Sequence, residues 1–472
     1  MTVTQQSSLP AQRFDAAGKA HVDLRAIFRL AAPLMATNAV QAVLNLTDLW
    51  FIGRLSTDAV AAMGAIYWIV SCAVLLFGGV GLAVQTFVAQ AFGSRRRARA
   101  SRAMWNAVWA SLAMIPVFLA LAAAGPLILT PFGLPPAVEA LALEYWQPRM
   151  TGAPLALLCW AAMGFFNGIS AVRFTMTVVV STTLANAFFN EWFMFGLDMG
   201  MAGAAWGTNA AQSVGAIVAF SIFLGSRIDA QYRSRMMWRA RWPVIRAQLI
   251  VGLPIGVMYG ADVLGLALSQ LMIAQTGAIG AAATQIVMAL TSLAYLPTIG
   301  VALAGTTLVG QSIGAGSPEW ANRMGNVVIV LCATLMALVA VFLLVVGPWL
   351  LPVFVSAGDA AAGEVVALGL VLLWPAAAYQ VFDGLYCGAG FSLRGAGDTR
   401  VPAATALCLS WFFFVPLAHT LIFAPGEGWI DGLPQFGLGA KGGWLALMSY
   451  VVLLGSAMLW RWRHGAWRRI QL

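Results

Sequence analysis

The sequence has few charged residues and few groups suited to covalent or metal chemistry. Only 9% of its 472 residues are charged, whereas soluble domains are about a quarter charged. It contains three histidines, two of them near the termini, and no HExxH motif, so we expect no enzyme. The five cysteines all fall in apolar stretches and indicate neither a disulfide framework nor a metal site. They are Cys72, Cys159, Cys332, Cys387 and Cys408.

The first 26 residues also contain no long apolar run. This stretch, MTVTQQSSLPAQRFDAAGKAHVDLRA, is polar, and a cleaved signal peptide needs an apolar segment of about 7–15 residues. We therefore expect residues 1–26 to form an N-terminal tail on the cytoplasmic side.

Long hydrophobic runs dominate the rest of the chain. Hydrophobic residues make up 61% of the sequence, and the mean hydropathy is +0.84. A helix needs about 20 apolar residues to cross a bilayer, and twelve runs are long enough. The sequence therefore predicts an all-α membrane protein with twelve transmembrane helices. The runs are 27–53, 58–92, 103–125, 137–169, 176–196, 201–225, 246–274, 280–311, 325–355, 364–391, 401–423 and 437–460.

The basic residues indicate the orientation of these spans. With the N-terminus inside and twelve crossings, 23 of the 26 fall on the inner side, as the positive-inside rule requires. The outer side receives Arg54, Arg149 and Lys441. The run RRRARASR at 95–102 is explained by this topology, so no nucleic-acid partner is expected. Both termini are predicted to be cytoplasmic.

The two halves of the chain repeat each other. With an offset of 221 residues, GVGLAVQTFVAQAFG (79–93) aligns with GVALAGTTLVGQSIG (300–314), with eight identities in fifteen positions. The same offset pairs Pro33 with Pro254, Pro154 with Pro375 and Arg173 with Arg394.

An even number of spans per repeat gives parallel repeats, an architecture that supports alternating access. We expect two pseudo-symmetric six-helix bundles: an N-lobe with its connecting loop (27–240) and a C-lobe (241–460), followed by a cytoplasmic tail (461–472).

Four acidic residues lie within the predicted spans, where acids are rare and usually functional. They are Asp48, Glu191, Asp262 and Asp383. The alternative for each is a structural acid satisfied by a neighbouring helix, and this alternative is strongest for Glu191.

In the N-lobe, Asp48 shares a helix face with other polar residues. Gln41, Asn45 and Asp48 are spaced i, i+4 and i+7, which places them on one face. Asn186 and Asn190 share a face of the fifth span, and Thr208 begins the sixth. A carboxylate among amide and hydroxyl oxygens suits Na⁺ or a proton.

In the C-lobe, two acids lie on separate spans. Asp262 is near the middle of span seven, and Tyr379 and Asp383 are spaced i, i+4 on span ten. If the two spans face each other, the carboxylates form a pair that can share a proton, and Tyr379 can donate a hydrogen bond. The alternative is two separate acids in a wet cleft.

Several stretches resemble the multidrug and toxic compound extrusion (MATE) family of secondary transporters. They are LAAPLMATNAVQAVLNLTDLWFIGRL (30–55), VGLAVQTFVAQAFG (80–93), GMAGAAWGT (200–208), GLPIGVMYGADV (252–263) and AYQVFDGLYCGAGFSLRGAGDT (378–399). The resemblance covers about residues 27–460 and is strongest to the NorM-type branch. It implies a C-lobe cation or proton site at Asp262, Tyr379 and Asp383. It also implies an N-lobe site at Asp48, Asn186, Asn190 and Thr208.

The chain departs from that branch at two positions. Asp262 stands where Glu is usual, and Glu191 where the family tends to be apolar or aromatic. Both leave the identity of the coupling ion, Na⁺ or H⁺, open.

Taken together, the resemblance and the intramembrane acids imply a cation-coupled antiporter of the bacterial inner membrane. We expect it to export cationic, amphipathic small molecules, to need no cofactor beyond the coupling ion and to act as a monomer in the lipid bilayer. The alternatives are an exporter or flippase of a metabolite or lipid-linked substrate on the same fold, or a channel. A flippase cleft is expected to be more basic than these spans are.

Overall fold

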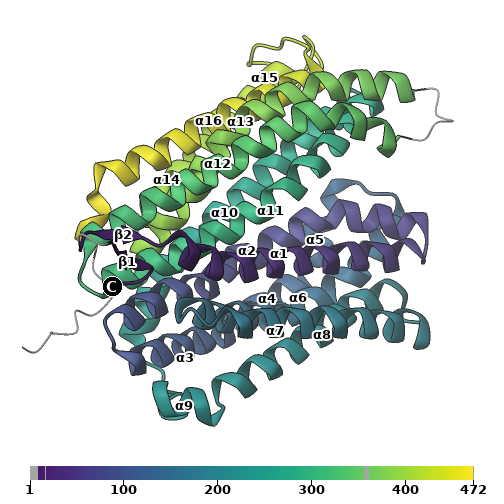
Figure 1. Ribbon diagram of the computed structural model, residues 1–472. Helices are drawn as coiled ribbons and strands as arrows, with labels where there is room; N and C mark the ends of the chain where they lie inside the picture. The colour runs from purple at the N-terminus through teal and green to yellow at the C-terminus, as the bar shows by residue number, and fades with distance from the viewer. Residues whose placement is uncertain (1–8, 16–17, 356–360, 471–472) are drawn as a thin grey trace, which may run out of the picture.

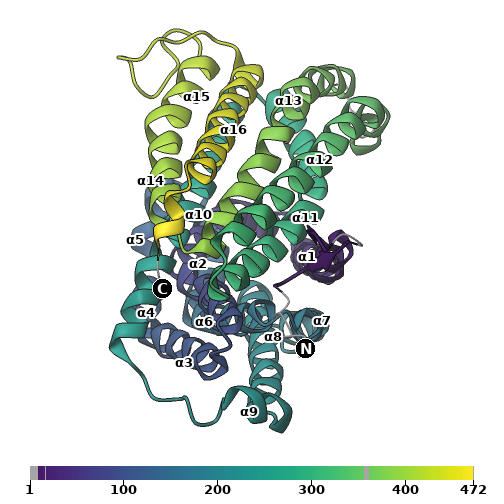
Figure 2. The same ribbon diagram turned by 60° about the vertical axis from the view of Figure 1, so that its left-hand side comes forward.

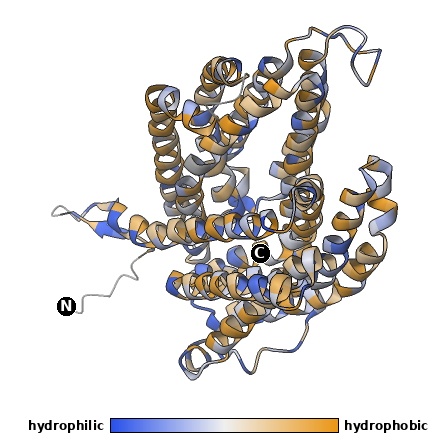
Figure 3. Ribbon diagram, turned by 90° about the vertical axis from the view of Figure 1, so that its right-hand side faces the viewer, coloured by the Kyte–Doolittle hydropathy of each residue, from blue (hydrophilic) through white to orange (hydrophobic). Residues whose placement is uncertain are grey.

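The computed structural model describes residues 9–15, 18–355 and 361–470, except for the side chains of 293 and 294. Within these ranges, eleven helical segments are long and apolar enough to cross a membrane, and counting the bent pair α8–α9 as one span makes twelve. Apolar residues cover most of their length (Figure 3). The prediction of an all-α membrane protein with twelve spans is confirmed.

The helices form two bundles, one from each half of the chain (Figure 1). We call α1–α9 the N-lobe and α10–α16 the C-lobe. The N-lobe helices are α1 (Leu24–Gly53), α2 (Thr57–Gly93), α3 (Arg97–Ala113), α4 (Ile115–Ala123), α5 (Gly125–Leu129), α6 (Pro136–Gly168), α7 (Val172–Asn190), α8 (Gly200–Phe223) and α9 (Ser226–Tyr232). A 3₁₀ turn, η1 (Thr130–Phe132), precedes α6, and a π-helical turn, η2 (Glu191–Gly196), follows α7.

The C-lobe has the same sequence of long helices. They are α10 (Trp242–Thr276), α11 (Ala278–Gly314), α12 (Pro318–Leu350), α13 (Ala362–Ala396), α14 (Arg400–Leu409), α15 (Val415–Ile422) and α16 (Gly439–His464). A second π-helical turn, η4 (Ser410–Phe414), joins α14 to α15, and 3₁₀ turns η3 (Leu351–Phe354) and η5 (Ala466–Arg469) follow α12 and α16. The turned view in Figure 2 shows α14–α16 along one side of this bundle.

The structure reproduces the sequence repeat in detail. Helices α2 and α11 begin and end at positions that differ by the same 221 residues, and both are 37 residues long. The π-helical turns η2 and η4 interrupt the fifth span of each half at nearly equivalent places. Ser56 caps α2 by accepting a hydrogen bond from the Ala59 amide, which satisfies one of the free donors of the first turn.

The two lobes are tied together at the arginine-rich ends of their helices by two pairs of equivalent hydrogen bonds. The Thr86 hydroxyl donates to the Arg394 carbonyl and the Thr307 hydroxyl to the Asn167 carbonyl, at 2.9 and 3.1 Å. Asn167 is thus the counterpart of Arg394, and the pairing of Arg173 with Arg394 by the constant offset is wrong. The offset changes because α13 is two residues longer than α6.

The second pair of hydrogen bonds comes from two glutamines. The Gln90 amide donates to the Gly395 carbonyl at 3.2 Å, and the Gln311 amide donates to the Gly168 carbonyl at 2.9 Å. Helices α2 and α11 cross here so closely that a Cβ on Gly93 or Gly314 would collide with the backbone of the other helix. The lobes are therefore closed against each other at this end.

Two features of the N-terminal segment were not predicted from the sequence. Residues Gln12–Phe14 (β1) and Ala20–Val22 (β2) form an antiparallel hairpin, and the indole of Trp320 on α12 donates to the Pro10 carbonyl at 2.9 Å. In addition, the first half of α1 packs into the apolar core of the C-lobe. The start of the chain therefore contacts the opposite lobe.

Candidate functional site

The N-lobe acid lies beside the two predicted asparagines. The Asn190 amide donates to the Asp48 carboxylate at 2.6 Å and to the Asn186 side-chain oxygen at 3.3 Å. Asn190 is the last residue of α7 before the π-helical turn, and Gly207 on α8 leaves the space that its side chain occupies. The predicted association of α1 with α7 is thus present in the structure.

The other predicted N-lobe residues stand further from this cluster. Thr208 is buried on α8, and its hydroxyl donates to the Ala204 carbonyl of its own helix at 3.0 Å. Gln41 and Asn45 are exposed. The contacts that hold Asp48 therefore come from α7, whereas its own helix contributes none of its printed hydrogen bonds.

Glu191 points away from the cluster to the rim of the lobe. Its carboxylate forms an ion pair with Arg54 at 2.6 Å, and both side chains are about half exposed, at 54% and 40%. The Arg54 guanidinium also lies 4.2 Å from the centre of the Phe195 ring. A partner at the rim accounts for this acid, so its role in transport stays an untested prediction.

Arg149 lies inside the N-lobe, and its assignment to the outer side of the membrane by the sequence count is wrong. It is thirteen residues inside α6 and is only partly exposed. Its guanidinium donates to the side-chain oxygens of Asn209 and Gln212 on α8, at 3.3 and 3.4 Å. It is close enough to Asp48 for the two charges to interact.

The C-lobe holds both of its acids near one another. Asp262 on α10 accepts hydrogen bonds from the hydroxyls of Tyr450 on α16, at 2.5 Å, and Tyr386 on α13, at 3.3 Å. Asp383, one turn before Tyr386, is close enough to Asp262 for the two carboxylates to interact electrostatically. The structure thus places these predicted residues on facing helices.

The hydrogen-bond donors to Asp262 differ from the one expected. Tyr379 is buried and stacks on Trp444, with ring centres 6.4 Å apart, and it contacts Thr291. Tyr386 and Tyr450 donate instead. The spacing of Tyr386, three residues after Asp383, places it on the same helix face and could have revealed it. Tyr450 gave no signal, because only packing brings α16 to α10.

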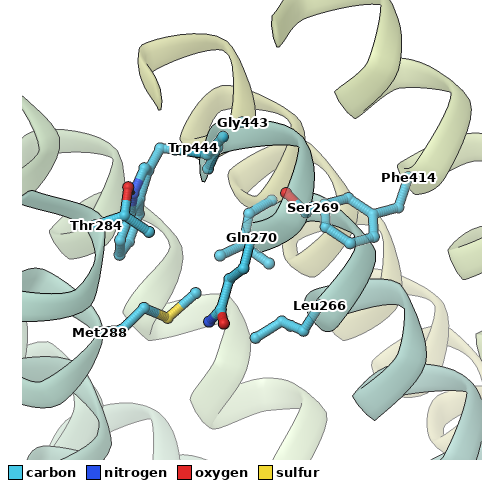
Figure 4. Close-up of a pocket in the computed structure, with 10 residues that line it drawn as sticks. Leu266, Ser269, Gln270, Thr284, Met288, Phe414, Gly443 and Trp444 are labelled. Carbon is cyan, nitrogen blue, oxygen red and sulfur yellow. Dashed lines mark hydrogen bonds between the residues drawn. The ribbon is translucent and has the colours of Figure 1, made fainter. Parts of the chain in front are cut away.

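Aromatic and apolar side chains line the C-lobe beyond the acids. Phe414 stacks on Tyr450 with ring centres 5.1 Å apart. One to two turns along α10 from Asp262, a small cavity of about 10 Å³ lies beside Gln270, whose side chain extends between Met288 and Leu266 (Figure 4). This volume corresponds to about one water molecule.

A GxSxG stretch, Gly310–Gly314, escaped the sequence analysis. In hydrolases this motif needs a strand-to-helix turn that exposes the serine. Here the stretch is helical at the end of α11, and the buried Ser312 hydroxyl donates to the Leu308 carbonyl at 2.7 Å. The motif is thus part of the helix crossing.

Comparison with known proteins gives a consistent result. The family model MatE matches residues 33–192 and 254–420. A probable multidrug resistance protein NorM of Mesorhizobium japonicum is 29% identical over 463 residues, covering 93% of each chain. The multidrug resistance protein NorM of Burkholderia vietnamiensis is 28% identical over 441 residues, covering 92% of each.

A solved structure has the same fold. It is described as the outward-facing conformation of a multidrug resistance MATE family transporter of the MOP superfamily. It matches with a TM-score of 0.79 at 18% identity and covers 94% of this chain and 96% of that one.

Proposed function

Because this chain belongs to the MatE family, we propose that it is a secondary antiporter that exports organic cations in exchange for Na⁺ or H⁺. Its substrates are cationic, amphipathic small molecules, and it works as a monomer in the bacterial inner membrane with both termini in the cytoplasm. The names of the NorM relatives support multidrug efflux, and the 23 basic residues assigned to the inner side support the orientation.

One observation carries this proposal: two carboxylates face each other inside the C-lobe. Asp262 and Asp383 interact electrostatically, and the printed hydrogen bonds to Asp262 come from neutral tyrosines. Two membrane-embedded negative charges without a basic partner attract a cation or a proton. The stacked rings of Phe414, Tyr450, Tyr379 and Trp444 add surfaces that favour an organic cation.

Exchange follows if substrate and coupling ion compete for these carboxylates. A proton or Na⁺ entering from outside neutralises the acids, removes their attraction for the drug and releases it outward. The hydrogen-bonded crossing of α2 and α11 closes the arginine-rich end meanwhile. One inward charge supplies about 2.3 kcal/mol per 100 mV of membrane potential, which sustains roughly a 50-fold substrate gradient.

Ethidium efflux from drug-sensitive bacteria tests the proposal. Cells carry wild type or the Asp383→Asn variant and are assayed with and without Na⁺ and with a protonophore. Wild-type efflux that the variant lacks supports the proposal, and the response to Na⁺ or protonophore identifies the ion. No efflux from well-expressed wild type contradicts the multidrug function and favours a metabolite or lipid-linked substrate.

A further inference from the structure

The charged groups of the N-lobe site include a fixed positive charge that the C-lobe lacks. The 221-residue offset places Leu370 opposite Arg149, Ser269 opposite Asp48 and Gln41 opposite Asp262. The N-lobe therefore combines one acid with one arginine, and the C-lobe combines two acids with tyrosines. An arginine inside a membrane helix is costly and is usually retained for function.

Several residues form a built site for Arg149. The Asn209 amide donates to the Pro148 carbonyl at 2.6 Å, which turns its oxygen toward the guanidinium. Gly152 makes this possible, because a Cβ there would collide with the Asn209 side chain. Tyr145, one turn earlier on α6, also contacts Arg149. Neutral oxygens thus hold the guanidinium in the lobe.

Arg149 is not locked to a carboxylate. Among the ion pairs of the described residues, with a limit of 4.0 Å, none includes Arg149. Asp48 is held by Asn190 in this structure, although the charge of Arg149 reaches it. The acid therefore has two alternative ways to lose its negative charge: a proton, or the nearby guanidinium.

The same arrangement leaves few oxygens for a sodium ion. Na⁺ needs several oxygen ligands, but the amide oxygens of Asn209 and Gln212 already accept from Arg149. Asn190 presents its NH₂ group to Asp48. A fixed guanidinium in the same lobe also repels Na⁺ through a medium of low dielectric.

We propose that Arg149 is the built-in counter-cation of Asp48, so that the N-lobe site exchanges protons and rejects Na⁺. This inference rests on the proposed antiport function and restricts it: any Na⁺ coupling belongs to the Asp262–Asp383 pair alone. The groups that face Asp48 are Asn186 and Asn190 from α7 and Arg149 from α6, with Tyr145 and Tyr67 close to the same cluster.

Binding of radioactive Na⁺ to the purified full-length protein tests the proposal without any drug. The background carries Asp262→Asn and Asp383→Asn, so that only the N-lobe can bind the ion. We expect no saturable Na⁺ binding in this background and none after adding Arg149→Lys, which keeps the charge. Adding Arg149→Gln is expected to create a site that binds Na⁺ at least tenfold more tightly, and Asp48→Asn is expected to remove it.

Two results would overturn the inference. One is saturable Na⁺ binding in the background with Arg149 intact. The other is no Na⁺ binding by an Arg149→Gln variant that elutes as a single species and keeps its thermal midpoint. If that variant does not fold, the first arm and the Arg149→Lys variant still decide. Failure of the antiport function appears separately, as lack of ethidium efflux.

Discussion

The N-lobe and the C-lobe share a backbone plan but carry different charges. Both have a 37-residue second helix and a π-helical turn in the fifth span. Each π-helical turn adjoins an acid: Asn190 before η2 holds Asp48, and the Ser410 hydroxyl at the start of η4 donates to the carbonyl of Ala261, next to Asp262. Duplication thus preserved the scaffold and the position of the site, while the ionisable residues diverged.

The difference matters because the two lobes handle charge in different ways. In the C-lobe, Tyr386 and Tyr450 stabilise a carboxylate without neutralising it, so the pair stays attractive to a cation. In the N-lobe, Arg149 supplies a positive charge near the single acid. The account therefore assigns cation competition to the C-lobe and a protonation step to the N-lobe.

The largest effect is expected from Asp383→Asn, which leaves the C-lobe with one acid. Coupled efflux should fall at least 100-fold, because the fixed neutral amide can no longer exchange a proton or Na⁺ for substrate. Ethidium efflux at matched expression measures this, and Glu364→Gln, an exposed acid at the start of the same helix, is the control. Wild-type efflux by Asp383→Asn would refute the carboxylate mechanism.

Asp48→Asn should also disable transport, by about tenfold or more, since the N-lobe then has no acid to protonate. Asp58→Asn, at the exposed start of α2, is the matched control. A silent Asp48→Asn variant would mean that Asp48 is structural and that the N-lobe takes no part in coupling.

The two C-lobe acids should behave as one unit. If Asp262 and Asp383 act on the same ion, the double Asn variant loses no more efflux than the worse single variant. The control pair is Asp48 with Asp383, which lie in different lobes. Losses that multiply for Asp262 and Asp383 would indicate two separate sites.

The tyrosines that hold Asp262 should give graded effects. Tyr450→Phe removes a 2.5 Å hydrogen bond and Tyr386→Phe a 3.3 Å one. A hydrogen bond to a charged group is worth about 1.5–3 kcal/mol, so we expect about a tenfold loss of efflux for Tyr450→Phe and a smaller loss for Tyr386→Phe. The reverse order would show that Tyr450 does not position this carboxylate.

The smallest effect is expected at the rim. Glu191→Gln breaks an exposed ion pair with Arg54, and such pairs contribute at most about 1 kcal/mol. Efflux and the thermal midpoint should stay close to wild type. A large loss of efflux at an unchanged midpoint would give Glu191 a place in the mechanism.

The sequence predicted the acids well because a charge inside an apolar run stands out without any structure. Asp48, Asp262 and Asp383 were all found in this way. Arg149 was misplaced because α6 has 33 residues, more than the roughly 20 needed to span the bilayer. The sequence alone does not say which turns of so long a helix lie inside the membrane.

Tertiary contacts set the remaining limit. Tyr450 reaches Asp262 across 188 positions in the chain, and no local pattern encodes that contact. The packing of the N-terminal hairpin on Trp320 was missed for the same reason. The repeat offset also failed at Arg394, because a constant shift cannot follow a helix that is two residues longer in one half.

Binding of ethidium to the purified protein tests the central claim most directly. The dissociation constant is measured over a range of pH and of Na⁺ concentration, for wild type and for the variant with Asp262→Asn and Asp383→Asn. The account predicts that protons or Na⁺ weaken ethidium binding to wild type at least tenfold, and that the variant binds weakly and without this dependence. Competition of the same size in the variant would place the exchange outside the C-lobe carboxylates and contradict the account.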